Sequence, residues 1–430
     1  MSVRNTFPQQ RPTLNLDFAN SKTLDPRITF TRTSTATYVD ESGVIRTAVA
    51  DEPRFDHDPA TGECLGLLIE ESRTNDIRNN TMQGAIAGTP GTAPTNWVLG
   101  TSAAGFTREI TDVGVENGIQ YVDIRWYGTA TGNPFSYLAF WPDGSNTINS
   151  PGTYTSRYTF SSYVKVVSGT VPSSTTFILV MTNADSGSIG LNEYKVSTIV
   201  SSSSVPTGNL IDNRFALTNT NFSNTNTAYF KPYFQWNIPN GTSMDVTIRI
   251  GLPQMEEGSF ATSAIPTTDQ GKTRNPDNAS ITGDNFSDWY NQSEGTIYVR
   301  GATCVSAANP VLVQVDDGAN NQRLQIRRIG ASGFAQFLVQ VGGVTQGNPG
   351  VSGFEANTYG KVISAYKKDD LITSFNGTLS LSITSAEIPI TLNRMTIGNA
   401  TGLLYPNSCI SQLTYYPVRL PNSILQSLTK

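Results

Sequence analysis

Short apolar runs separated by turn sequences recur along the whole 430-residue chain. The runs are rich in Val, Ile, Tyr and Phe, which fit the pleated, half-buried surface of a sheet better than a helix. From about residue 95 to residue 265 their spacing, with Gly, Ser and Asn in the turns, is typical of a jelly-roll β-sandwich. This pattern predicts strands at residues 121–126, 157–167, 176–181, 214–217 and 245–250.

The N-terminal stretch predicts short strands joined by tight turns. Residues 37–39 and 44–48 flank the polar sequence Asp40-Glu41-Ser42-Gly43, which is a hairpin signal. Farther along, an unbroken apolar run is bounded by acidic residues and is typical of a strand buried on both faces. The large side chains of this run are Leu65, Leu67, Leu68 and Ile69.

The C-terminal stretch repeats the strand pattern and adds two local signals. Asn376-Gly377, between apolar residues, is the strongest short hairpin signal in the chain. Residues 422–429 are compatible with one or two turns of helix. Strands are expected at residues 295–300, 311–315, 323–329, 334–341, 361–366 and 409–416.

Two composition shifts divide the chain. Gly and Pro follow one another closely between residues 79 and 94, and residues 266–276 contain two prolines, one glycine and no large apolar side chain. The expected fold class is all-β: an N-terminal β-hairpin module followed by two β-sandwich (jelly-roll) domains. The expected division is a module at residues 1–78, a sandwich at 79–265, a linker at 266–276 and a second sandwich at 277–430.

Charge and hydropathy exclude several classes of protein. Charged residues make up only 15% of the chain, so the Glu/Lys-rich segments that build long soluble helices are missing. The net charge is -5 and no Lys/Arg run exceeds a pair, which argues against a nucleic-acid groove. The N-terminal residues contain no apolar signal region and no stretch approaches a membrane span. We therefore expect synthesis in a cytoplasm and no membrane insertion.

The usual signatures of chemistry are missing too. The sequence has no zinc, thiol-redox, nucleotide or α/β-hydrolase motif, and sequential acidic pairs point to opposite faces of a strand. The single histidine, His57, is expected in a solvated turn, and Cys64, Cys304 and Cys409 are expected to be free thiols. We expect no enzyme activity, no catalytic residue, no metal and no cofactor.

Aromatic and polar residues instead suggest sugar binding. Aromatic rings stack on the C–H faces of sugars, while Asp, Asn and Arg side chains supply directional hydrogen bonds. Each tryptophan has the alternative role of filling a sandwich core, and the sequence leaves that alternative open. The candidate ligand-binding residues are Trp126, Tyr127, Trp141, Asp143 and Asn146.

Three stretches carry a resemblance to a known class. Residues 30–75, with the phrases TRTS at 31–34 and GLLIEESRTN at 66–75, resemble a segment recurrent in tail and head-fibre proteins of tailed bacteriophages. Residues 251–268 resemble the last strand and exit of carbohydrate-binding-module-like jelly rolls in the same proteins. Residues 363–378, with 397–398 and 413–420, are similar to concanavalin A-like or laminin-G-like sandwiches. Residues 97–240 match only by pattern.

The resemblance implies a structural protein of the virion surface, either a fibre or a capsid-decoration subunit. Its partners would be other virion proteins and a host-surface glycan. Phage fibres are commonly three-fold, so we expect a homotrimer held through the N-terminal module, with Leu65, Leu67, Leu68 and Ile69 completing their core on a partner. Two alternatives remain: a receptor-binding tail fibre in which glycan recognition is essential, and a capsule-depolymerising tailspike.

Overall fold

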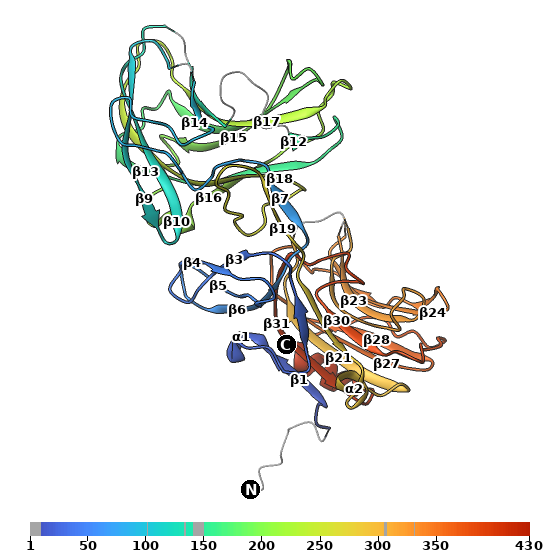
Figure 1. Ribbon diagram of the computed structural model, residues 1–430. Helices are drawn as coiled ribbons and strands as arrows, with labels where there is room; N and C mark the ends of the chain where they lie inside the picture. Colours follow the sequence, from blue (N-terminus) through green and yellow to red (C-terminus); the bar gives the residue numbers. More distant parts are fainter. Residues whose placement is uncertain (1–9, 101, 133–134, 141–149, 305–307, 331) are drawn as a thin grey trace.

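The computed structural model describes residues 10–100, 102–132, 135–140, 150–304, 308–330 and 332–430. Strands account for 49% and helices for 5%, so the predicted all-β class is confirmed. Figure 1 shows two bodies joined by a narrow waist, and in the lower body the blue N-terminal strands lie against the orange and red C-terminal ones. We call the lower body the terminal sandwich, because both ends of the chain build it, and the upper body the central sandwich.

The terminal sandwich packs two antiparallel sheets around one core. The strand order of its first sheet is β29 (Thr378–Leu379), β28 (Asp370–Phe375), β27 (Gly360–Lys367), β21 (Glu294–Gly301), β31 (Ser408–Tyr416), β6 (Cys64–Ile69) and β5 (Phe55–His57), and β1 (Leu14–Asp17) also pairs with β31. The order of its second sheet is β2 (Thr29–Thr31), β20 (Asn278–Thr282), β30 (Arg394–Ile397), β22 (Val311–Asp316), β23 (Arg323–Ile329), β24 (Phe334–Val341) and β25 (Val344–Gly347), and β26 (Gly350–Val351) pairs with β24.

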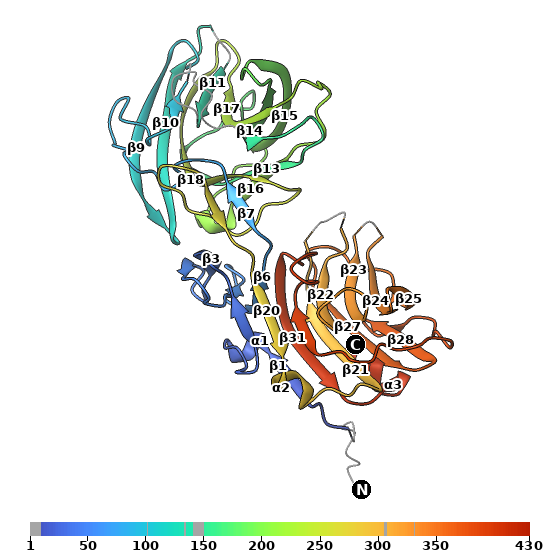
Figure 2. The ribbon, with the colours of Figure 1, turned by 45° about the vertical axis from the view of Figure 1, so that its right-hand side comes forward.

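This arrangement corrects the expected N-terminal module. Strand β6 pairs with β31 in the register Leu67↔Ile410, and the two lie side by side in Figure 2. Leu67 and Ile69 are fully buried in the core of the terminal sandwich. Leu68 is also buried, and Leu65 is half-buried with its carbonyl accepting a hydrogen bond from the Tyr359 hydroxyl. The chain covers this apolar run itself, so the run offers no seam for a partner subunit.

The central sandwich is formed entirely by residues between β7 (Arg73–Asn75) and β19 (Lys272–Arg274). One sheet, which we call the hairpin-side sheet, has the order β16 (Arg214–Thr218), β13 (Tyr158–Gly169), β18 (Ser243–Glu257), β10 (Ile119–Thr129) and β9 (Phe106–Glu116). The other, the distal sheet, has the order β15 (Gly190–Ser201), β14 (Thr176–Ala184), β17 (Tyr229–Asn237), β11 (Phe135–Ala139) and β8 (Val98–Leu99), and β12 (Ser150–Pro151) pairs with β17.

A β-hairpin braces the two bodies. Strands β3 (Ala36–Val39) and β4 (Ile45–Ala48) form the hairpin predicted at Asp40–Gly43. Val39 and Ile45 pack on the outer face of the hairpin-side sheet, against a small cluster that includes Tyr121, Leu210 and Leu252. The Ile45 amide also donates to the carbonyl of Asn117. The hairpin therefore belongs to the terminal sandwich by chain connection and contacts the central sandwich by packing.

The hairpin turn and the helix expected near the C-terminus were predicted correctly. Asn376 and Gly377 form the turn between β28 and β29, with φ angles of 44° and 82°, and both values are positive as a tight hairpin turn requires. Helix α3 (Asn422–Thr429) lies where one or two helical turns were expected, after Pro421 at its N-cap. The other short helices in the described ranges are α1 (Phe18–Ser21), α2 (Asp284–Ser287) and η2 (Leu210–Asp212).

His57 differs from its expected place in a solvated turn. Its side chain is buried, and Nδ1 lies 3.0 Å from the carbonyl oxygen of Val39. The reason is that β3 packs over β5, which the hairpin signal alone did not reveal. All three cysteines are free, as predicted, and burial raises the pKa of Cys304 to about 12. None of the helices in the described ranges is long and apolar enough to cross a membrane.

A buried ionic network stabilises the waist, the region around β7 and β19 where the chain passes between the two bodies. Arg54 donates to Glu70 over 2.8 Å and to Asp277 over 2.5 Å, and Arg32 donates to Asp277 over 2.9 Å. Ser263, which leaves the central sandwich, donates through both its amide and its hydroxyl to Glu70. Burial acts to raise the pKa of Glu70, but nearby arginines and Ser263 lower it to about 2, so the carboxylate stays charged.

The composite core generates a test by truncation. Residues 277–430 alone lack β1, β2, β5 and β6, and we expect this fragment to show no cooperative thermal transition by circular dichroism, because its core is left open. Co-expression with residues 1–75 should restore the transition.

The matched control is residues 76–265, which contain both sheets of the central sandwich and should melt cooperatively alone. A stable, cooperatively folded monomer of residues 277–430 would contradict the composite core.

Candidate functional site

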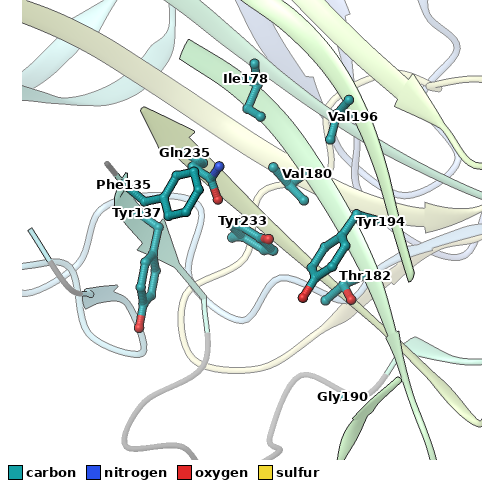
Figure 3. A pocket seen from close by; sticks show the side chains of 10 residues that line it. All are labelled: Phe135, Tyr137, Ile178, Val180, Thr182, Gly190, Tyr194, Val196, Tyr233 and Gln235. Atoms are coloured by element: carbon teal, nitrogen blue, oxygen red, sulfur yellow. The ribbon is translucent and has the colours of Figure 1, made fainter. Parts of the chain in front are cut away.

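The outer face of the distal sheet forms a broad hollow of about 610 Å³. Figure 3 shows the side chains around it, which come from β11, β14, β15 and β17. Most are aromatic, aliphatic or amide-bearing, and none of the described residues that line it is charged. The lining residues are Phe135, Tyr137, Ile178, Val180, Thr182, Gly190, Tyr194, Val196, Tyr233 and Gln235.

Strict alternation places these side chains. In β17, Phe234 and Trp236 point into the core of the central sandwich while Tyr233 and Gln235 point out of it, since successive residues of a strand face opposite sides. The register then sets each next to its neighbours: Tyr233 lies opposite Val180, and Val180 lies opposite Val196. The hollow is thus a continuous surface that crosses four strands.

Aromatic rings border the hollow. Tyr137 and Tyr233 contact edge to face, with ring centroids 6.2 Å apart and planes at 69°. Phe135 and Tyr194 have exposed fractions of 44% and 54%, so their ring faces are available to a ligand. Burial raises the pKa of Tyr233 to about 12, so its hydroxyl is a neutral group that can both donate and accept hydrogen bonds.

Amide side chains supply the polar part. Gln235 donates to Asn237 Oδ1 over 2.6 Å, and Asn237 donates to Thr176 Oγ1 over 3.0 Å. This chain of bonds orients the Gln235 side chain beside the aromatic rings. Lys231, next along the outer side of β17, donates to the carbonyl of Ser188, and burial lowers its pKa. Rigid rings beside oriented amides suit a ligand that has apolar faces and many hydroxyls.

The predicted residue Trp126 lies elsewhere. Its side chain is only 1% exposed, it packs on Phe177 and Trp236, and its indole N–H donates to Ser136 Oγ over 3.0 Å. The alternative role, core filling, is therefore the one the structure gives it. Tyr127, the next residue of β10, points to the outer face of the hairpin-side sheet, where the Arg125 guanidinium lies 4.3 Å from its ring centroid. The pair does not form one site.

Trp141, Asp143 and Asn146, the other predicted ligand residues, lie outside the residues that the structure describes. Trp289, another tryptophan followed by a tyrosine, is also unavailable to a ligand, because it is buried against Phe286 and Tyr415 in the terminal sandwich.

Sequence reasoning missed the residues that line the hollow. A signal was present in YFKPYFQWN at Tyr229–Asn237, where aromatic side chains occupy both the odd-numbered and the even-numbered positions of one strand. One set of alternate positions must fill the core. The other set, which includes Tyr233, must therefore place its aromatic rings on the outer face.

The described residues offer neither a cluster of metal ligands nor an exposed, reactive thiol at Cys409. Across the described ranges, no group of three or more His, Cys, Asp or Glu side chains is arranged to hold a metal ion. Cys409 is buried, and that burial raises its pKa well above the ordinary value, which disfavours the reactive thiolate.

Comparison with known proteins gave structural neighbours alone. No protein-family model matches the sequence, and no curated protein does. A carbohydrate-binding module, CBM40, of the Ruminococcus gnavus IT-sialidase, solved with α2,3-sialyllactose, is 16% identical, with 33% of this chain and 84% of that chain covered and a TM-score of 0.29.

Two further neighbours cover more of the chain. Domains LG4-5 of the mouse laminin α1 chain are 9% identical, with 62% of this chain and 82% of that chain covered and a TM-score of 0.22. The Trypanosoma rangeli sialidase is 10% identical, with 92% and 76% covered and a TM-score of 0.27. At these TM-scores the likenesses do not bear on what this chain binds.

Substitution at β10 tests the assignment of its two aromatic residues. Trp126→Ala should lower the free energy of unfolding by about 3–5 kcal/mol, because it opens a cavity in the core and removes the partner of Ser136. Tyr127→Ala, the matched control on the opposite face of the same strand, should lower it by less than about 1 kcal/mol. Urea titration of both variants measures the difference, and equal losses would mean that the facing of β10 is misassigned.

Proposed function

We propose that the chain binds carbohydrate on the outer face of the distal sheet. The observation that carries this proposal is the ring of Phe135, Tyr137, Tyr194 and Tyr233 around one hollow, with the oriented amide of Gln235 beside it. Sugar rings present apolar C–H faces to aromatic side chains and hydroxyls to amides. A hollow of about 610 Å³ lies in the range of small-ligand sites and accommodates a few sugar units.

The chemistry of the lining favours uncharged glycans. Among the described residues, the lining includes no carboxylate, guanidinium or ammonium, so an acidic sugar would find no opposite charge in it. The same lining supports a non-enzymatic role, because hydrolysis of a glycosidic bond requires two carboxyl groups about 5–9.5 Å apart on either side of that bond. We propose that the site holds a glycan and leaves it intact.

The biological setting that we propose is the surface of a bacteriophage particle. The support is the resemblance of residues 30–75 and 251–268 to phage tail and head-fibre proteins. In this setting the chain is a fibre or capsid-decoration subunit, made in the host cytoplasm, that adheres to host-surface glycans. A homotrimer remains part of the proposal, with an interface other than Leu65–Ile69.

The binding site is tested by a matched pair of tyrosine variants. Tyr194→Ala removes an exposed ring from the hollow, and we expect it to weaken binding about two- to tenfold, the range for one lost aromatic contact. Tyr127→Ala removes a ring from the opposite sheet and should leave affinity unchanged. Affinity electrophoresis in gels that contain dextran, mannan, galactan or host-surface polysaccharide provides the measurement.

Equal retardation of the Tyr194→Ala variant and the unchanged protein in every gel would place the binding site elsewhere. The polysaccharides recovered from the same incubations should keep their chain length. Shortening that disappears on substitution of one Asp or Glu would replace the binding proposal with an enzymatic one.

The virion setting has a separate test. An antibody raised against the central sandwich, residues 76–265, should label intact particles of the phage that encodes this chain at regularly spaced sites in immunogold electron microscopy. Absence of the chain from purified particles by mass spectrometry would sink the virion role and leave the glycan site standing.

A further inference from the structure

Arg274 is the most unusual charged residue at the waist. Its side chain is 1% exposed, and the nearest carboxylate oxygen, Glu70 Oε2, lies 3.6 Å from Nε. Among the described residues, none of its three nitrogens has a hydrogen-bond partner. Arg32 and Arg54, buried in the same region, donate to carboxylates and carbonyls instead. Because a buried guanidinium without hydrogen bonds is costly, this one marks a place built for an acceptor.

The Arg274 side chain borders a small hollow of about 190 Å³. Lys272 borders it as well, since residues two apart in β19 lie on the same face of the strand. The opposite wall carries the hydroxyls of Thr35, Thr37 and Thr47, from the β3–β4 hairpin and the turn before it. Residues 264–266, which leave the central sandwich, complete the lining, and it contains no carboxylate.

Two positive groups and the hydroxyls of Thr35 and Thr47 around a small hollow form a donor set for an anion, while the Thr37 hydroxyl already donates to the carbonyl oxygen of Ala264. The Lys272 ammonium lies 3.2 Å from Thr35 Oγ1, so the lysine reaches across the mouth of the hollow. The guanidinium of Arg274 offers a planar fork of N–H donors that matches two oxygens of one oxyanion. Lysine adds a point charge, and the hydroxyls of Thr35 and Thr47 can donate to the remaining oxygens.

The carboxylates near Arg274 accept hydrogen bonds from other groups. Arg32, Arg54 and Arg274 face only two directly paired carboxylates, those of Glu70 and Asp277. Glu256 is also buried nearby, but its oxygens accept hydrogen bonds from Gln254 and from the amide and hydroxyl of Thr262. Asp56 lies near Arg54 as well, so what singles out the hollow is that Arg274 and Lys272 border it and none of its lining residues carries a carboxylate.

We propose that this hollow binds a tetrahedral oxyanion of the phosphate or sulfate class between Arg274 and Lys272. The anion bridges β19 to the β3–β4 hairpin and to residues 264–266, so its binding stabilises the waist between the two sandwiches. This site is separate from the glycan-binding face, which lies on the distal sheet at the opposite side of the central sandwich.

Equilibrium dialysis of the full chain against radiolabelled sulfate tests the proposal, at an ionic strength held constant with chloride. We expect one saturable site per chain and a melting temperature that rises with sulfate or phosphate but not with chloride. Lys272→Met should weaken sulfate binding about tenfold or more, the loss expected for one charge-assisted hydrogen bond. Lys367→Met, which removes an exposed lysine of β27, is the matched control and should bind like the unchanged chain.

Arg274→Met should abolish sulfate uptake, and its circular dichroism spectrum shows whether it still folds. If it does not fold, Lys272→Met decides the outcome alone, because Lys272 is exposed at the mouth and outside the core. Absence of saturable uptake up to about 10 mM sulfate, or uptake that Lys272→Met leaves unchanged, would overturn the anion site. Tyr194→Ala should leave sulfate uptake intact, so failure of the glycan site and failure of this one are distinguishable.

Discussion

The contact between Arg54, Glu70 and Asp277 is the constraint on which the rest of the molecule depends. These three residues lie directly before β5, directly after β6 and directly before β20, and all three are buried. A buried ion pair adds little net stability compared with apolar packing, but removal of one partner leaves an unpaired charge and costs about 3–5 kcal/mol. The network therefore specifies one arrangement of the N-terminal and C-terminal segments and penalises every other.

That arrangement explains how one chain builds two bodies. The polypeptide leaves the terminal sandwich through β7, completes the central sandwich and returns through β19, which pairs with β7. The hydroxyls of Thr74 and Thr273 lie 2.8 Å apart across this pair. The central sandwich is thus an insertion whose two ends meet, the geometry in which a domain can be accommodated without disturbing its host. The hairpin contact with Tyr121 and Leu252 then limits rotation about the waist.

The sequence predicted local elements well and their partners poorly. Turn chemistry at Asp40–Gly43 and at Asn376-Gly377 located two hairpins, because the residues that determine such turns are adjacent. The unbroken apolar run of β6 correctly indicated a strand buried on both faces. It did not reveal that the strand pairing with Leu67 begins at Ser408, since a hydrophobic pattern records burial and not the identity of the neighbour. The missing partner was consequently assigned to a second subunit.

The prediction of the candidate ligand-binding residues met a related difficulty. Trp126 and Tyr127 are adjacent in sequence, and composition alone cannot decide which of two neighbouring strand residues points into a core. The two outcomes are opposite: Trp126 fills the sandwich and Tyr127 faces outward. In β17 the decision was available, because aromatic residues of both parities had to divide between the two faces. Composition placed the candidate residues in the central sandwich, and only the strand register shows which face of a sheet each side chain occupies.

The phage-like phrases of the sequence coincide with the waist and not with the hollow. Arg32 lies in the phrase at residues 31–34, Glu70 in that at 66–75, and Ser263 in the stretch at 251–268. Arg32 and Glu70 are buried and Ser263 is half-buried, and each is held by hydrogen bonds in the network that restrict substitution. The aromatic face, between Phe135 and Gln235, falls within residues 97–240, which match by pattern alone. The resemblance therefore follows the scaffold that holds the two sandwiches together, and the strand face that we propose as the glycan site lies outside the resembling phrases.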